Sequence, residues 1–420
     1  MAAAGVRPTL QEEHTFFESV HAMLSVVDVP IEIVQAILQR HLADRSAHLT
    51  DLELSPIASD GYSGNHLFRA HLTWSSAAPG VMRRTSTWVL KRWQQGGHCE
   101  RLLGVDQPLE ALGWKDGLLR PEALPAGVTT PIVGVWLYSA GRGAWIAMED
   151  VAPALRRYSR DAPLHPTEAA AATRLVLDRL ARLHTHWERP ERQATLRRCP
   201  WLVPMERYLW CQAASVSAVL GRATPNGIAP GSELTDEFRA DVEAFFAWLP
   251  SRDRAMFEEL FCRRERIVSA MRAFPRTLIH GDIGDRNLGL RPSTNPAAPA
   301  DETELVLIDW EWMGFGSPAL DVARLWGGFP GVCDQSLPLP EIAFTDELPA
   351  CYFERYREYG GVLLDDSAWQ RACSLALLGL CMSQVSFIGS TIRYDVSRIV
   401  SGLARQLDML TGTARSLLAD

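Results

Sequence analysis

The spacing of apolar residues separates a strand-rich first part of the chain from a helix-rich remainder. Apolar residues recur at helical intervals over residues 12–26 and 30–43, which predicts a helical cover at the N-terminus. Residues 52–74 and 86–93 instead alternate apolar and polar side chains on either side of a polar turn. Such alternation is typical of half-buried strands, so we expect a small antiparallel sheet.

The strand pattern continues to about residue 150 and then stops. A helix is expected near residues 106–119, and residues 129–139 and 143–151 supply two further strands. Beyond them the pattern is mainly helical, as in residues 169–187, where apolar side chains fall on one helical face. The sequence therefore predicts a sheet-containing first lobe followed by a helical second lobe.

Composition is that of a soluble globular protein. The 420 residues are 47% hydrophobic and 22% charged, enough to build substantial cores. A net charge of −8 provides no general electrostatic footprint for nucleic acid, so we expect no nucleic-acid partner. The oligomeric state is not predicted by any of these features.

No stretch of the sequence suggests a membrane-spanning or secreted protein. The N-terminal stretch turns acidic where a signal peptide would need an apolar segment. Residues 372–392 lack charges over a membrane-spanning length, but serines and a glutamine interrupt the apolar surface, so we expect a buried helix. The eight cysteines are scattered without metal-ligand spacing, which favours reduced thiols in a cytoplasm.

One charged stretch, "LIHGDIGDRNLGL" at residues 278–290, interrupts the apolar second part. Carboxylates beside apolar strands are costly to desolvate unless something binds them. Asn287 begins a short strand and Asp309 ends the next one, so antiparallel pairing would bring them together. Their oxygens suit Mg²⁺, and Asp282, in the loop just before, could accept a hydroxyl proton or orient the nucleophile.

Residues 280–287, "HGDIGDRN", and residues 307–325, "LIDWEWMGFGSPALDVARL", together resemble the aminoglycoside phosphotransferase and choline kinase superfamily. The resemblance covers roughly residues 50–330. It implies an α+β, bilobal, protein-kinase-like fold. Residues 1–150 would form a nucleotide-binding lobe with a small antiparallel sheet. Residues 151–420 would form a mainly helical catalytic and acceptor-binding lobe.

The same resemblance implies roles for individual residues of the charged stretch. Asp282 would be the catalytic base, and Asn287 and Asp309 would be magnesium ligands. His280 would organise the catalytic loop. Asp321 would brace that loop from the following helix, although an acid at that position can also simply favour the start of a helix.

The first lobe offers a cation for nucleotide phosphates. Lys91 and Lys115 are the only lysines among 42 basic residues, which suggests that Lys91, on a strand, meets a need for a compact ammonium. An exposed strand residue is the alternative interpretation. The acidic partner of Lys91 is expected on the next helix, where Glu110 fits best. Glu100 is the rival, and either acid could instead be a solvated surface residue. Because the charge would act on phosphates and not on a core, we expect loss of Lys91 to leave the fold nearly intact.

Other positions are candidates for nucleotide contacts. The Gly-containing segment between the first two strands could cover the phosphates, or it could be a simple hairpin turn. The residues concerned are Gly61, Ser63, Gly64 and Asn65. The stretch "AMEDV" resembles a linker between lobes, where backbone groups of Glu149 and Val151 could bind adenine.

Two positions of the catalytic loop bear on the acceptor. Gly284 stands where Ser/Thr-type protein kinases carry a lysine, which favours a small-molecule acceptor. Arg286 could stabilise charge at the catalytic centre or form a salt bridge with a neighbouring acid. Trp310 and Trp312 could line an acceptor pocket, but alternating aromatics are also ordinary packing.

Residues 301–370 hold 14 acidic and 3 basic residues, a local charge of −11. If part of this charge lines a cleft, it would favour a cationic acceptor such as an amino sugar, aminoglycoside or amino alcohol. A solvated acidic surface is the alternative. The leading hypothesis is thus a small-molecule kinase that uses ATP and Mg²⁺. A nucleotide-binding pseudokinase or regulatory module is the second, and a protein kinase the third.

Overall fold

The computed structural model describes most of the chain. The described residues are 31–57, 65–77, 83–94, 107–138, 143–152, 166–221, 235–284, 287–293, 302–327, 347–362, 364–395 and 403–419. The helix predicted over residues 12–26 lies outside them.

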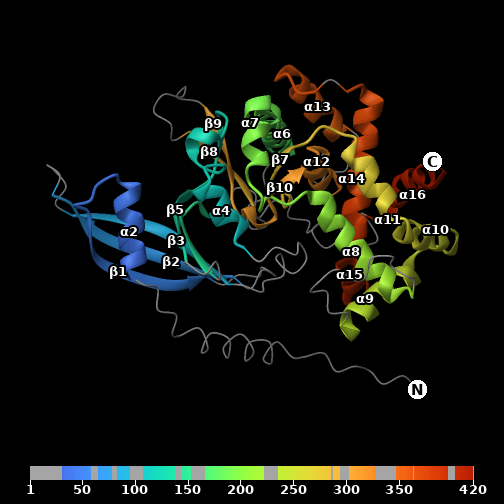
Figure 1. Ribbon diagram of the computed structural model, residues 1–420, viewed down its shortest axis with the longest axis horizontal. Coiled ribbons are helices and arrows are strands. Elements are labelled where there is room, and N and C mark those ends of the chain that lie inside the picture. The colour runs from blue at the N-terminus through green and yellow to red at the C-terminus, as the bar shows by residue number, and fades with distance from the viewer. Residues whose placement is uncertain are drawn as a thin grey trace.

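A five-stranded antiparallel sheet forms the first part of the molecule (Figure 1). The strand pairings confirm the predicted antiparallel sheet. In spatial order the strands are β1 (His48–Ile57), β2 (His66–Ser75), β3 (Arg84–Gln94), β6 (Gly143–Glu149) and β5 (Ile132–Leu137).

Different elements cover the two faces of this sheet. Helix α2 (Ile31–His41), which confirms the helix predicted over residues 30–43, packs its apolar stripe on one face, where it shares a hydrophobic cluster with Trp88 and Leu90 of β3. Successive residues of a strand point to opposite faces. Lys91 therefore projects from the other face, toward the rest of the molecule.

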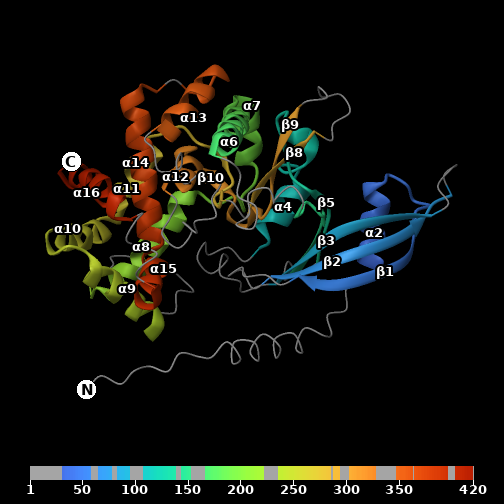
Figure 2. The ribbon, with the colours of Figure 1, turned by 180° about the vertical axis from the view of Figure 1, so that it is seen from behind.

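Short elements lie between the sheet and the helical part, as the two views of the ribbon show (Figures 1 and 2). These elements are α4 (Leu109–Lys115), η1 (Pro121–Ala123), β4 (Val128–Thr129), β8 (Leu288–Pro292) and β9 (Thr303–Leu307). Strand β9 pairs in parallel with β4 and antiparallel with β8. A segment from before residue 150 is thereby hydrogen-bonded to one from after it.

The remainder is mainly helical, which confirms the predicted α+β class. Two short strands, β7 (Thr277–Ile279) and β10 (Gly314–Gly316), pair antiparallel within it, and η3 (Trp310–Trp312) follows β9. The helices are α6 (Pro166–Glu188), α7 (Pro190–Arg197), α8 (Met205–Val219), α9 (Asp236–Trp248), α10 (Ser251–Cys262), α11 (Arg264–Arg272), α12 (Ala319–Gly327), α13 (Glu347–Glu358), α14 (Asp366–Ser383), α15 (Val385–Asp395) and α16 (Leu403–Ala419).

The uncharged stretch 372–392 is helical and largely buried, but the prediction of a single helix was wrong. Helix α14 ends at Ser383 and α15 begins at Val385, because Gln384 leaves helical geometry and its N–H bonds back to the Cys381 carbonyl. Among the described residues, no helix combines the length and hydropathy that a membrane crossing needs. Five of the eight cysteines have described side chains, and these five form no disulfide with one another.

Candidate active site

Residues 280–287, here called the catalytic loop, follow strand β7 and turn at Gly281. Gly281 has φ = 80°, in the left-handed region that glycine adopts without strain. A Cβ atom at this position would lie 2.2 Å from the carbonyl oxygen of Trp312. The loop and the segment after β9 therefore approach more closely than any other residue type would allow.

Asp321, at the start of α12, holds the backbone of this loop. It is fully buried and accepts hydrogen bonds from the N–H groups of His280, at 2.9 Å, and Gly281, at 2.8 Å. Its third partner is His184 Nε2 at 3.1 Å. Burial alone would raise the pKa of Asp321, but the hydrogen bond and charge of His184 lower it. Asp321 is therefore an ionised anchor.

His280 fixes the loop to the end of β9. Its Nε2 lies 2.8 Å from the carbonyl oxygen of Ile308, and its ring lies 4.5 Å from the ring of Trp310. The N–H of Asp282 donates to His280 Nδ1 at 3.3 Å. His184, on α6, is likewise fully buried.

The pairing of β8 with β9 brings Asn287 to the end of β9, as predicted. Leu288 lies opposite Leu307, and the N–H of Ile308 donates to the Asn287 carbonyl at 3.0 Å. The Asn287 amide nitrogen donates to Asp282 twice, to its carbonyl oxygen at 2.9 Å and to Oδ2 at 2.8 Å. One oxygen of the Asp282 carboxylate is thereby held in place.

Lys91 lies at the centre of a cluster of acidic side chains. Its Nζ is 2.8 Å from Glu110 Oε2, 2.6 Å from Asp309 Oδ1 and 2.6 Å from Glu311 Oε1. Lys91 is only 4% exposed, so the alternative of an exposed strand residue is wrong. The cluster joins β3 and α4 to the segment that follows β9.

Electrostatics within this cluster are strong because the groups are buried together. Burial alone would lower the pKa of Lys91, but the charges of Asp309, Glu110 and Glu311 raise it well above its ordinary value. Burial raises the pKa of Glu311 to about 8, and Asp309 and Glu110 add to this rise while Lys91 opposes it. Carboxylates outnumber cations, so the cluster favours an additional positive charge.

The donor atoms fit a hard divalent cation such as Mg²⁺. Oxygen atoms of Glu110, Asp309 and Glu311 all lie within 4.8 Å of one another. The NH₂ group of Asn287 donates its hydrogen bonds to Asp282, so Oδ1 is the side-chain atom of Asn287 that can bind a cation. Asp309 also has φ = 61°, a strained conformation for a non-glycine residue of the kind found at functional sites.

The other predicted site residues are only partly placed. Asn65 donates to a carboxylate oxygen of Glu311, and so reaches the cluster from the start of β2. The Glu149 N–H donates to the Pro131 carbonyl at 2.8 Å, so an adenine contact from Glu149 would use its carbonyl. Val151 is buried just beyond β6. Ser63, Gly64, Arg286 and the rival partner Glu100 lie outside the described residues.

The two tryptophans after Asp309 differ in their surroundings. Trp310 is fully buried, and its indole N–H donates to the Leu307 carbonyl, so it packs in the core. Trp312 is half-buried and meets Tyr208 of α8 edge to face at 4.7 Å between ring centroids. Trp312 is thus the better placed of the two to border an acceptor site.

Two residues of the site were not singled out from the sequence. Glu311 stands two positions after Asp309, and this Asp-Trp-Glu spacing was an available signal. Arg324 lies one helical turn after Asp321 on α12, and its Nη2 contacts Asp282 Oδ1. The contact between Arg324 and Asp282 links residues 42 positions apart, which no local pattern reveals.

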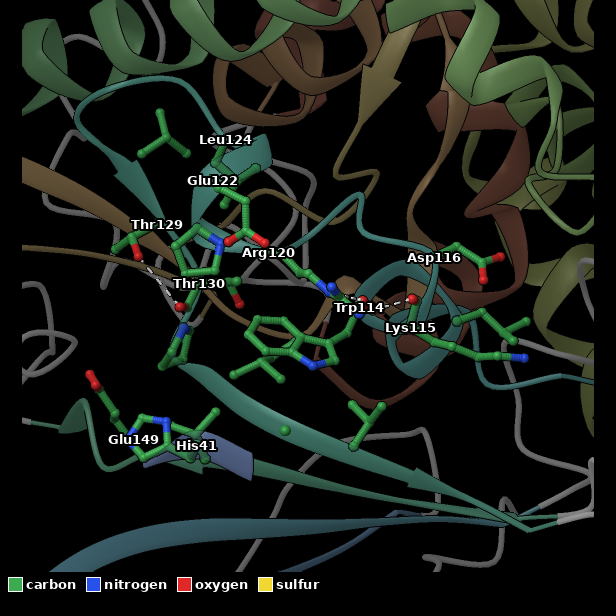
Figure 3. Close-up of a pocket in the computed structure, with 18 of the residues that line it drawn as sticks. His41, Trp114, Lys115, Asp116, Arg120, Glu122, Leu124, Thr129, Thr130 and Glu149 are labelled. Atoms are coloured by element: carbon green, nitrogen blue, oxygen red, sulfur yellow. Dashed lines mark hydrogen bonds between the residues drawn. The ribbon is translucent and has the colours of Figure 1, made fainter. Parts of the chain in front are cut away.

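A separate cavity of ≈1680 Å³ lies beside β5, on the side of the molecule that holds α2, α4 and η1. Figure 3 shows Trp114, Arg120, Thr130 and Glu149 among the residues that line it. Of the predicted site residues that the structure describes, only Glu149 is in its wall. The cavity is therefore distinct from the cluster around Lys91 and Asp282.

Comparison with solved structures returns several kinases at low similarity. A Plasmodium vivax ethanolamine kinase is 11% identical with a TM-score of 0.48, over 99% of this chain and 93% of that one. A choline/ethanolamine kinase family protein from Mesorhizobium loti is 14% identical with a TM-score of 0.41, over 95% and 99%. Amicoumacin kinase is 12% identical with a TM-score of 0.40, over 95% of both chains. These values are too low to carry a conclusion about this chain.

No curated protein sequence matches the chain. The sequence profile of the phosphotransferase enzyme family, however, matches residues 83–359. That span includes Lys91, the catalytic loop, Asp309 and Asp321, and it covers well over half of the chain. The protein therefore belongs to the phosphotransferase enzyme family.

Proposed function

We propose that this protein is an ATP-dependent kinase that transfers the γ-phosphate to a hydroxyl group of a small molecule. The observation that carries the proposal is the convergence of two distant segments. Lys91, held by Glu110, contacts Asp309 at 2.6 Å, and the β8–β9 pair links Asp309 to Asn287 and Asp282. Phosphoryl transfer depends on such positioning and electrostatics more than on covalent chemistry.

Each residue of the convergence has a chemical task in this proposal. Asp282 accepts the proton of the acceptor hydroxyl or orients that hydroxyl. Its side chain is 24% exposed, so an acceptor can reach it from solvent. Lys91 positions the nucleotide phosphates. Asn287 and Asp309 would hold Mg²⁺, which when bound neutralises charge on the phosphates. Arg286 would add positive charge near the transferred group.

The nucleotide contacts are proposed for residues of the first lobe. Ser63, Gly64 and Asn65 would cover the phosphates, and the contact of Asn65 with Glu311 supports this placement. Backbone groups of Glu149 and Val151 would bind adenine at the end of β6.

The proposed acceptor is an amino sugar, aminoglycoside, amino alcohol or related metabolite. Support comes from the acidic character of residues 301–370, whose charge of −11 favours a cationic molecule nearby. Gly284 in place of a lysine also favours a small molecule over a protein.

The proposal is tested by measuring ADP release with panels of amino sugars, sugars, nucleosides and amino alcohols. Once an acceptor is known, Asp282→Asn should retain affinity for ATP and Mg²⁺, because Lys91 and the metal ligands hold the nucleotide. Its single-turnover rate should fall by about 100- to 10,000-fold. Asp366→Asn, at an exposed position at the start of α14, is the control and should match the parent.

Two outcomes would contradict the proposal. ATP binding without turnover for every acceptor class would favour a nucleotide-binding pseudokinase. A rate for Asp282→Asn within about tenfold of the parent would place the base elsewhere.

A further inference from the structure

Helix α12 reaches the catalytic loop twice. Asp321, in its first turn, accepts the backbone N–H groups of His280 and Gly281. Arg324, three residues later and so on the same side of the helix, contacts Asp282 Oδ1 through Nη2. One helix therefore holds both the backbone of the loop and the carboxylate that the loop carries.

The platform for these contacts is rigid. Val322, Ala323 and Leu325, the neighbours of Arg324 on α12, are all at most 1% exposed. A functional side chain held by a packed helix is positioned more exactly than one on a loop. Arg324 itself is largely enclosed, with 13% of its side chain exposed.

Both oxygens of the Asp282 carboxylate are engaged. Arg324 binds Oδ1, and the Asn287 amide donates to Oδ2 at 2.8 Å. Two donors on opposite oxygens define the plane of a carboxylate, which a single donor cannot do. Arg324 and Asn287, and not the rotamer preferences of Asp282 itself, then set the orientation of the Asp282 carboxylate.

Stability alone does not account for this arginine. A partly buried ion pair contributes little net stability because desolvation offsets the attraction. Among the described residues, the Arg324 Nε has no hydrogen-bond partner although it is buried, which adds a further cost. An apolar side chain in place of Arg324 would avoid both costs. The contact with Asp282 therefore explains better why an arginine stands at this position.

We propose that Arg324 is the positioning residue of the catalytic carboxylate. It acts through Asp282, together with Asn287, by fixing the direction in which the carboxylate meets the acceptor hydroxyl. This inference rests on the proposed role of Asp282. It also means that the charge of Asp282 is balanced locally, so any attraction for a cationic acceptor must come from other acidic groups.

A double-mutant cycle with an acceptor from the ADP-release panels tests this role. Arg324→Met should lower kcat by about 10- to 100-fold, the usual result of a misplaced catalytic group, with the KM for ATP unchanged. In an Asp282→Asn background the same change should cost less than about twofold, because Arg324 acts through the group already removed. Arg324→Lys should recover part of the loss, since it keeps a cation but not the planar fork.

Arg393→Met is the matched control. Arg393 donates to Asp241 Oδ1 at 2.6 Å and so joins α15 to α9, two helices that do not contribute residues to the catalytic loop. Its loss should lower the melting temperature without lowering kcat. Equal losses from Arg324→Met in both Asp282 backgrounds would overturn the proposal, because Arg324 would then act on a substrate directly. An unchanged kcat in Arg324→Met would overturn it as well.

A second measurement needs no acceptor, and so separates this inference from the proposed function. Peptides covering residues 278–290 should exchange amide hydrogen faster in Arg324→Met than in the parent or in Arg393→Met. If the parent turns over no acceptor, the proposed function fails, and faster exchange still supports the anchoring role. Exchange equal to that of the parent would contradict that role.

Discussion

At the scale of single residues, the site depends on side chains that are charged and buried at once. Lys91 is 4% exposed and Glu110 is 1% exposed, yet they share one cluster with Asp309 and Glu311. Such groups are tolerated only when each has a partner. Lys91 is therefore a structural residue as well as a candidate phosphate ligand.

Replacing Lys91 should consequently affect folding, contrary to what the sequence suggested. Lys91→Met leaves the carboxylates of Glu110, Asp309 and Glu311 without their cation, and we expect the free energy of unfolding to fall by roughly 3–5 kcal/mol. Denaturant unfolding measures this change. Lys115→Met, at the other lysine of the chain, is the control because Lys115 is exposed. A loss below about 1 kcal/mol for Lys91→Met would show that the cluster relaxes without its cation.

Glu311 predicts a pH dependence of stability. Its pKa in the folded protein is raised from 4.5 to about 8, so between these values the folded state holds a proton that the unfolded state has lost. Stability should therefore fall as pH rises through this window, by up to about 1.4 kcal/mol per pH unit. Urea unfolding with a chelator present, at several pH values from 5 to 8, should show a flatter profile for Glu311→Gln. Identical profiles for parent and variant would rule out this titration.

At the scale of elements, local patterns predicted local contacts and missed distant ones. The five-residue spacing of Asp282 and Asn287, and the strands on either side of them, indicated a shared site, and the β8–β9 pairing is present. Arg324 could not be predicted, because its contact with Asp282 depends on how α12 packs and not on spacing. The break between α14 and α15 was missed since Gln384 is not a strong helix breaker.

The turn of the catalytic loop gives a prediction with a close control. Gly281→Ala places a Cβ in a left-handed conformation and against the Trp312 carbonyl, so the loop must shift. We expect a loss of about 1–3 kcal/mol in unfolding free energy, with lower kcat. Gly284→Ala, three residues on, meets no atom of the described residues within 4 Å and should change stability by less than about 0.5 kcal/mol. Equal stability of the two variants would mean that the turn adapts without strain.

At the scale of the whole molecule, the site is assembled from both parts of the chain. Lys91 and Glu110 come from the sheet and the helix beside it, whereas Asp282, Asn287 and Asp309 come from segments after β7. The fold class was predictable because alternation and helical periodicity change near residue 150. The acceptor was not, because no stretch of the sequence carries a pattern that is specific to one class of acceptor.

An assembly of this kind should be stabilised as a unit by nucleotide and metal. ATP with Mg²⁺ at about 100 times the dissociation constant should add about 2.7 kcal/mol to the free energy of unfolding and raise the melting temperature. Asp282→Asn should show the same ligand-induced shift, because Asp282 is proposed to meet the acceptor. Asp309→Asn should lose the magnesium-dependent part, since a charged oxygen ligand is replaced by a neutral amide. A chelator should produce the same loss in the parent.

The ligand-induced shift in melting temperature, and not the absolute melting temperature, is the quantity to compare, because Asp309→Asn also removes one carboxylate from a crowded cluster. A full shift in Asp309→Asn, or in the parent with chelator, would mean that nucleotide binding does not use this cluster.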